Sequence, residues 1–206
     1  IRDDKTLREI SKDFINAMSE TTVAGEMVFW NNQEYQLLAA LTGFVIQKHL
    51  KNKAYKNTFE QVAAILKSEN VYDVNKSKRF FDENEIEGAA LELWNSFLMF
   101  SGTDKTRASI MGGLAEKMNL FALDGIKKMT RKTTLKLEEL GVIKEKPKAI
   151  FILMPDGRDT FSPLINMFIS SMFNQLYETA YKNNNTLQVP VYAILDEFCN
   201  IGRIPN

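Results

Sequence analysis

The sequence predicts a mostly α-helical chain in which an all-helical bundle is joined to part of an α/β domain. Two observations lead to this fold class. From about residue 30 to about residue 123, apolar residues recur at helical spacing and no stretch has the pattern of a strand. After Gly125, two short apolar runs flank a helical segment, in the strand, helix, strand order that is typical of α/β domains.

The composition excludes several classes of protein. The 206 residues carry 26 Lys and Arg and 26 Asp and Glu, so no net charge draws the whole chain to nucleic acid or to an anionic membrane. A single cysteine, Cys199, excludes internal disulfides and suits a reducing compartment. The lone His49 cannot build a multi-histidine metal site, and the most apolar stretch, residues 37–46, is too short to cross a bilayer.

The first two predicted helices lie on either side of a glycine. Apolar residues at helical spacing predict a helix over residues 7–18. The chain enters a second helix at Phe29-Trp30, where the side chain of Asn31 or Asn32 can cap the free backbone donors. The broad apolar face of this second helix predicts a central position in a bundle.

Three further helices complete the predicted bundle. A capping box at residues 58–61, Thr-Phe-Glu-Gln, starts the third helix. We expect residues 70–78 to form a loop before the fourth helix, which Gly102 ends. Thr103 or Asp104 can cap the fifth. The Met and Phe residues in these helical stripes are interpreted as core.

Five basic residues follow the helical bundle. They could contact the phosphates of a nucleic acid. No aromatic residue lies among them to stack on bases, and a solvated surface is the more common meaning of such a cluster. The five residues are Lys127, Lys128, Arg131, Lys132 and Lys136.

The α/β part is predicted from two apolar runs. Residues 149–154 end in Pro-Asp-Gly, which is the pattern of a strand followed by a tight turn. A Ser-Pro pair then starts a helix over residues 162–181. The second run, residues 189–195, has no helical period and predicts a strand that is buried on both faces, as in a parallel sheet under helices.

Two adjacent carboxylates, Asp196 and Glu197, follow the second predicted strand. Ligands bind at the carboxyl ends of strands in such sheets, so this pair predicts a Walker B arrangement for nucleotide hydrolysis. Asp196 would hold Mg²⁺ through water, and Glu197 would orient the attacking water. Asp156 would share the same edge if the two strands are neighbours. The alternative interpretation is a solvated acidic turn.

A Walker B site also needs a phosphate-binding loop that ends in Gly-Lys-Ser or Gly-Lys-Thr. No such loop occurs in the 206 residues. The nearest stretch, residues 112–117, reads Gly-Gly-Leu-Ala-Glu-Lys and has neither the spacing nor the hydroxyl.

Several stretches together resemble one family, the coupling-protein ATPases of type IV secretion and bacterial conjugation, also called TraG-like proteins. The most specific is residues 195–205, Leu-Asp-Glu-Phe-Cys-Asn-Ile-Gly-Arg-Ile-Pro, which is similar to the family's Walker B signature with its glycine-containing tail. Residues 29–41, 105–110 and 146–156 also resemble the family, in the same order along the chain. Gly157 and Arg158 depart from it, since the family often has a serine in that turn.

The resemblance implies a fold in which an all-α domain is inserted in a RecA-like P-loop nucleotide-binding domain. Residues 1–28 would be a segment of the nucleotide-binding domain or a linker, residues 29–124 the all-α domain, and residues 125–206 the part of the RecA-like domain that includes Walker B. It also implies ATP and Mg²⁺ as cofactors, with Glu197 catalytic and with Asp196 and Asp156 at the nucleotide.

The same resemblance implies a homo-hexameric, ATP-driven DNA motor at the cytoplasmic face of the bacterial cell membrane. Its partners would be the relaxase and other relaxosome proteins, single-stranded DNA and the secretion channel. Because the chain starts at Ile1 without a methionine and lacks the phosphate loop, we expect a soluble, monomeric fragment that is inactive alone. A RecA-like helicase or translocase outside secretion, and a non-catalytic docking module, are the alternatives.

Overall fold

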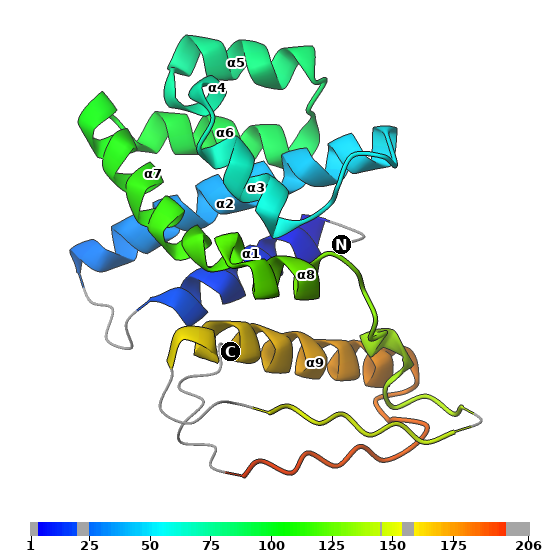
Figure 1. The fold of residues 1–206 in the computed structure, drawn as a ribbon. Coiled ribbons are helices and arrows are strands. Elements are labelled where there is room, and N and C mark those ends of the chain that lie inside the picture. The colour runs from blue at the N-terminus through cyan, green and yellow to red at the C-terminus, as the bar shows by residue number, and fades with distance from the viewer. Residues whose placement is uncertain (1–3, 20–24, 145, 154–158, 197–206) are drawn as a thin grey trace. The chain divides into compact units, whose positions relative to one another are not determined.

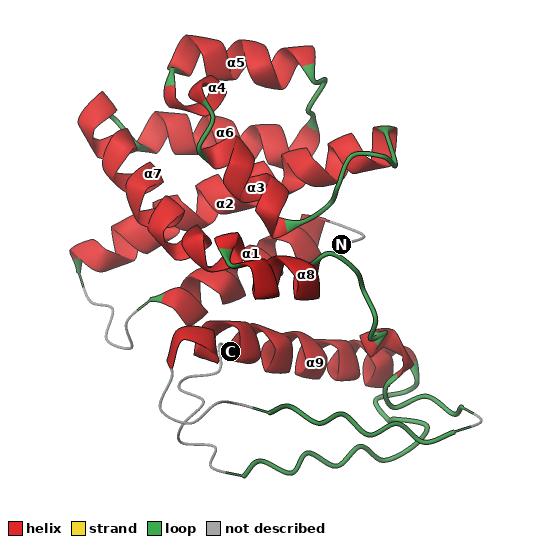
Figure 2. Ribbon diagram, viewed as in Figure 1, coloured by secondary structure: helices red, strands yellow, loops and turns green. Residues whose placement is uncertain are grey.

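The structure is a computed structural model of the chain, and it describes residues 4–19, 25–144, 146–153 and 159–196. The chain divides into two compact units, Ile1–Lys132 and Thr133–Asn206, which we call unit 1 and unit 2. In the described part of both units, all regular secondary structure is helical (Figure 2). The mostly helical class is therefore confirmed, whereas the domain limits predicted at residues 28 and 124 stay predictions.

Unit 1 is a bundle of helices around one long central helix (Figure 1). Its elements are α1 (Asp4–Met18), α2 (Glu26–Lys51), α3 (Phe59–Leu66), α4 (Glu69–Tyr72), α5 (Val74–Glu83), α6 (Gly88–Phe100), α7 (Asp104–Met118), the 3₁₀ helix η1 (Asn119–Ala122) and α8 (Asp124–Thr130). Helix α2 contacts α1, α3, α6 and α7. Leu37, Leu38 and Leu41 on it are fully buried, so its predicted central position is confirmed.

Aromatic rings fill much of the core of unit 1. Phe14 of α1 stacks on Phe59 of α3 with 5.9 Å between ring centroids, and both rings contact Phe121. Phe81 of α5 stacks on Trp94 of α6 at 4.8 Å. Pairs of this kind contribute roughly 0.5–1.5 kcal/mol each beyond their burial. The rings therefore stabilise the bundle, as the interpretation of these residues as core requires.

Helices α2 and α6 approach each other closely at Gly43. A Cβ atom at this position would lie 2.7 Å from the Cβ atom of Ala90, closer than side chains can pack, so only glycine allows this approach. One turn further along α2, the Gln47 amide donates to the Glu87 carbonyl at 2.8 Å and accepts from the Glu87 backbone N–H at 3.0 Å. These contacts fix the position of α6 along α2.

Helix α2 begins earlier than predicted. It starts at Glu26, and Gly25 with a positive φ of 65° is its N-cap residue. Asn31 and Asn32 therefore lie inside the helix, and the prediction that one of them caps it is wrong. Asn31 instead accepts a hydrogen bond from the Ser19 hydroxyl at 3.1 Å. Glycine adopts the positive φ at position 25 without steric cost, so the helix can start immediately afterwards.

The loop predicted at residues 70–78 is wrong, because α4 and α5 follow each other there with only Asp73 between them. The Asp73 carboxylate accepts hydrogen bonds from the backbone N–H groups of Asn75 at 2.8 Å and Lys76 at 2.9 Å, which caps α5. These bonds, that from Lys76 above all, stabilise the charged form and hold the pKa of Asp73 below its ordinary value. The Asp73 cap thus stabilises a helix in a segment whose polar composition suggested a loop.

The capping box predicted for α3 forms in one direction only. The Thr58 hydroxyl accepts a hydrogen bond from the Gln61 backbone N–H at 3.3 Å, as expected. The Gln61 side chain does not return to Thr58 but donates to the Tyr55 hydroxyl at 3.1 Å. At α7, the N-cap residue is Thr103, one of the two predicted candidates.

The described residues of unit 2 include one long helix. Its elements are η2 (Leu137–Glu139), η3 (Asp159–Phe161) and α9 (Ser162–Lys182), and η2 packs on α9. Helix α9 confirms the helix predicted over residues 162–181. Pro163 lies in its first turn, where the missing backbone N–H of a proline costs nothing.

The two predicted strands are not strands in the described residues. Residues 149–153 and 189–195 are extended but do not pair as strands (Figures 1 and 2). A strand needs hydrogen-bonded neighbours, and two strands are too few for an independently stable sheet. The prediction that residues 189–195 are buried on both faces is also wrong, since large side chains of both runs are exposed. Four of their large apolar side chains are almost fully exposed: Phe151 at 86%, Leu153 at 92%, Tyr192 at 84% and Ile194 at 92%.

Candidate functional site

Asp196 is the one residue of the three predicted site residues that the structure describes. It lies in a turn directly after residues 189–195 and is exposed to solvent. Glu197 and Asp156 lie outside the described residues, so the structure does not bring the three together. An exposed carboxylate of this kind is chemically suited to a hydrated Mg²⁺, which takes oxygen ligands and keeps several of its waters.

The start of the segment that leads to Asp196 is held by Gly141. The Gly141 carbonyl accepts hydrogen bonds from the backbone N–H of Gln188 at 2.9 Å and of Val189 at 3.3 Å. In return, the Ile143 backbone N–H donates to the Gln188 side-chain oxygen at 3.0 Å. Three hydrogen bonds therefore join the turn after η2 to the first residues of this segment.

Two features of the structure favour glycine at position 141. Its φ of 74° lies in the left-handed region that side chains disfavour. A Cβ atom there would also lie 2.7 Å from Leu187 Cδ2. We did not predict this anchor from the sequence, although an isolated glycine between Leu140 and Val142 is a signal for a tight turn or a close backbone approach.

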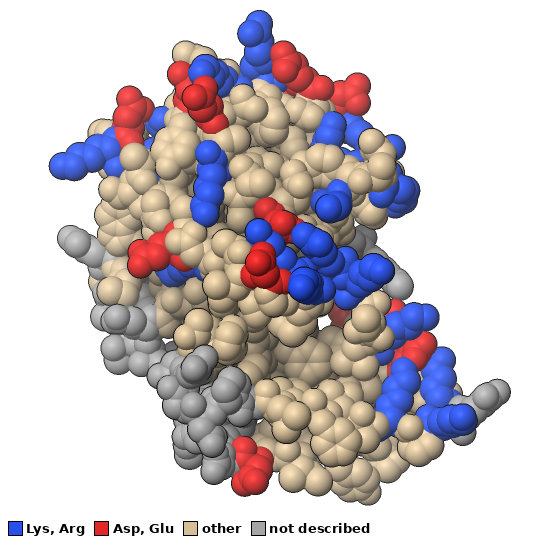
Figure 3. Space-filling model, in the orientation of Figure 1, with Lys and Arg blue, Asp and Glu red and all other residues tan. Residues whose placement is uncertain are grey.

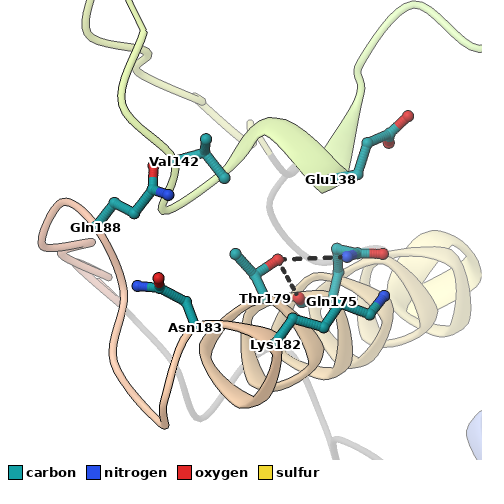
Figure 4. A pocket seen from close by; sticks show the side chains of 7 residues that line it. All are labelled: Glu138, Val142, Gln175, Thr179, Lys182, Asn183 and Gln188. Atoms are coloured by element: carbon teal, nitrogen blue, oxygen red, sulfur yellow. Dashed lines mark hydrogen bonds between the residues drawn. The ribbon is translucent and has the colours of Figure 1, made fainter.

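A pocket of about 300 Å³ opens beside this anchor, between η2, the end of α9 and Gln188 (Figure 4). Most of its polar groups already have partners within unit 2. The Thr179 hydroxyl donates to the Gln175 carbonyl at 2.8 Å, and the Asn183 amide donates to the Thr186 carbonyl at 3.0 Å. The lining residues are Glu138, Val142, Gln175, Thr179, Lys182, Asn183 and Gln188.

The pocket is not the predicted nucleotide site. It lies where the segment of residues 189–195 begins, whereas Asp196 follows its other end. Catalytic carboxylates would be expected at the carboxyl end of a strand, not at its start. We interpret the pocket as part of the packing between α9 and the turn at Gly141.

A buried ion pair joins α2 to α7 in unit 1. Glu34 of α2 is 5% exposed, and its carboxylate pairs with the Lys117 ammonium of α7. Glu34 lies on the same helical face as Leu37, Leu38 and Leu41, so its position in the apolar stripe signals a buried charge that needs a partner. The partner itself could not be identified from the sequence.

The Gly-Gly-Leu-Ala-Glu-Lys stretch forms the other side of this ion pair. It lies inside α7, not in a loop, so it cannot cradle phosphates. Gly113 and Lys117 are one helical turn apart and both face Glu34. A Cβ atom at Gly113 would overlap the Glu34 carboxylate, whereas one at Gly112 would meet nothing within 4 Å. The glycine therefore serves helix packing.

Large apolar side chains are exposed at several helix ends in unit 1. Met27, Val28 and Phe29 lie in the first turn of α2, and Met99 and Phe100 in the last turn of α6. Apolar side chains that are left in water are candidates for contact with another protein.

The structure divides the five basic residues between the two units. Lys127 and Lys128 of α8, with Arg131 and Lys132 directly after it, belong to unit 1. Lys136 belongs to unit 2, where it lies 3.8 Å from the Glu139 carboxylate. Four of the five residues of the predicted cluster therefore lie in unit 1.

Neither a metal site nor a membrane span occurs in the part of the chain that the structure describes. Its His, Cys, Asp and Glu residues form no group of three that could hold a metal ion. None of its helices combines the length and the apolar character needed to cross a bilayer.

Comparison with known proteins gives one family. No curated protein and no solved structure matches the chain significantly. The family model described as type IV secretory system conjugative DNA transfer matches residues 3–206, which include both units and the acidic pair. The resemblance read from the sequence is therefore confirmed, and the chain belongs to the conjugative DNA transfer family of type IV secretion systems.

Proposed function

We propose that the chain is part of a coupling protein, the ATP-driven motor that delivers DNA to the channel of a conjugative type IV secretion system. The observation that carries this proposal is the family match over residues 3–206. In this proposal, unit 2 belongs to a RecA-like nucleotide-binding domain, and unit 1 receives the relaxase–DNA complex or protein substrates. The intact protein forms a homo-hexamer at the cytoplasmic face of the membrane.

The exposed apolar runs of unit 2 support a larger sheet in the intact protein. Phe151, Leu153, Tyr192 and Ile194 each leave more than four fifths of their surface in water. Side chains of this size contribute about 1.5–3 kcal/mol each when they are fully buried. Further strands and covering helices would bury them and pair the backbone of both runs. The segment before Asp196 would then be a strand whose carboxyl end faces the nucleotide.

The proposed chemistry is hydrolysis of ATP at the end of this segment. Asp196 would hold Mg²⁺ through water, and the bound ion would supply positive charge to the transferred phosphate. Glu197 would accept a proton from the attacking water and orient it, a role that needs a carboxylate within hydrogen-bond reach. Asp156, after the other apolar run, would lie on the nucleotide side of the same edge. The phosphate loop would come from outside these 206 residues.

Replacement of Glu197 by Gln tests the motor. In the intact protein, Glu197→Gln should leave ATP binding unchanged and lower the steady-state rate of ATP hydrolysis by about 10² to 10⁴-fold, because the amide cannot accept the proton. Glu138→Gln is the matched control, since Glu138 is an exposed carboxylate of η2 away from Asp196, and it should not change the rate. Unchanged turnover in Glu197→Gln would remove this residue from the mechanism.

Capture of the relaxase tests the docking role separately. The exposed apolar ends of α2 and α6 support a protein-binding surface on unit 1. The 206-residue chain, immobilised and incubated with purified relaxase and its accessory proteins at micromolar concentration, should retain at least one of them. Retention of none would contradict docking by unit 1, whatever the ATPase assay shows.

A further inference from the structure

Four cationic side chains lie within six residues at the end of α8. Lys127 and Arg131 are four residues apart, as are Lys128 and Lys132. The backbone of Arg131 keeps helical angles after α8 ends, so Lys127 and Arg131 lie on one side of this turn. In Figure 3, blue side chains gather on the part of the surface where Figure 1 places α8. We call these four residues the α8 basic surface.

One carboxylate of α3, Glu60, forms ion pairs with two of these four residues. Glu60 lies 3.7 Å from the Lys127 ammonium and 3.6 Å from Arg131 Nε. Both distances exceed those of a hydrogen bond, and all three side chains are partly exposed. Exposed ion pairs of this kind stabilise a fold very little. Lys127 and Arg131 can therefore turn to another anion at little cost.

The other half of the surface faces water. Lys128 and Lys132 are exposed and form no ion pair with any residue that the structure describes. Asp124, in the first turn of α8, is the one carboxylate of this helix. The four cations thus outnumber Glu60 and Asp124 by two, in a chain whose total charge is zero. This local excess is not a consequence of a basic composition.

We propose that the α8 basic surface binds the phosphate backbone of the transferred DNA, with the Glu60 carboxylate as an internal competitor for two of its cations. The proposal deepens the proposed function, since the family transfers DNA and unit 1 is proposed to receive it. No aromatic residue lies among the four to stack on bases, so binding runs through phosphates alone. It is therefore independent of sequence and sensitive to salt.

The test is the affinity of the 206-residue chain for a fluorescent single-stranded oligonucleotide, measured by anisotropy at several salt concentrations. Lys128→Ala with Lys132→Ala removes two phosphate contacts. The slope of log affinity against log salt should fall by about 1.4, and affinity at low salt should fall about tenfold or more. The control pair, Lys78→Ala with Lys105→Ala, removes two exposed lysines of α5 and α7, and should leave the slope unchanged.

Replacement of Glu60 by Gln tests the competitor. Because Glu60→Gln releases Lys127 and Arg131, it should tighten DNA binding and make its salt dependence steeper. A duplex of the same sequence should compete, since it offers the same phosphates. The proposal is overturned if both lysine pairs lower the affinity equally, or if Glu60→Gln does not tighten binding. It is also overturned if the α8 lysine pair loses relaxase capture while its DNA affinity stays unchanged, which would assign the surface to an acidic protein segment. The ATPase assay of Glu197→Gln is independent of all these outcomes.

Discussion

Two adjacent glycines of α7 should respond in opposite ways to the same substitution. Alanine favours a helix interior by about 1 kcal/mol over glycine. At Gly112 a methyl group meets no atom within 4 Å, so Gly112→Ala should raise stability by up to about this amount. At Gly113 the methyl group overlaps the Glu34 carboxylate. That carboxylate is buried and paired with Lys117, so it cannot move aside without weakening the ion pair.

The size of the difference follows from the overlap. Overpacking of a buried contact costs about 1–3 kcal/mol, so Gly113→Ala should be less stable than Gly112→Ala by that amount. For a chain of this size, each kcal/mol corresponds to roughly 2–4 °C in the midpoint of thermal unfolding. Circular dichroism melting curves of the two variants and the parent chain measure it. Equal midpoints for both variants would refute the close packing of α7 on Glu34.

Two more substitutions test one contact inside each unit, the Glu34–Lys117 ion pair of unit 1 and the Gly141 anchor of unit 2. Lys117→Met leaves the buried Glu34 carboxylate without its cation, so it should lower the free energy of unfolding in urea by roughly 3–5 kcal/mol. The double variant Glu34→Leu with Lys117→Met should restore most of this loss. A double variant as unstable as the single one would contradict a buried pair. Gly141→Ala should lower the free energy of unfolding by about 1–2 kcal/mol through its left-handed backbone alone, and it should speed amide exchange at Gln188. The control Gly125→Ala, with no atom within 4 Å of the new methyl group, should do neither. Protection of the Gln188 amide in Gly141→Ala would contradict the anchor.

Most of the helical unit could be predicted because its signals are local. The stripe on residues 37–41 and the Thr58 cap depend on neighbours within a few residues, and both are present. The start of α2 was missed because the backbone turn at Gly25 outweighed a possible asparagine cap. The helix at Asp73 was missed because one side chain capped a segment that reads as polar.

Contacts between distant parts of the chain could not be predicted in the same way. The position of Glu34 in an apolar stripe announces a buried charge, but its partner lies on another helix that no periodicity identifies. The runs at residues 149–153 and 189–195 carry the composition of buried strands, yet burial depends on neighbours that the composition does not supply. Asp196 is described at the end of its run, and its role as a magnesium ligand stays a proposal.

Amide exchange along residues 191–195 tests the central claim most directly, namely that these residues form a strand that presents Asp196 to a nucleotide. It would be measured by mass spectrometry in both the 206-residue chain and the proposed intact protein. We predict fast exchange in the former, where the structure leaves these residues unpaired with any strand, and strong protection in the latter, where a completed sheet would bond them. Equally fast exchange in the intact protein would contradict the account.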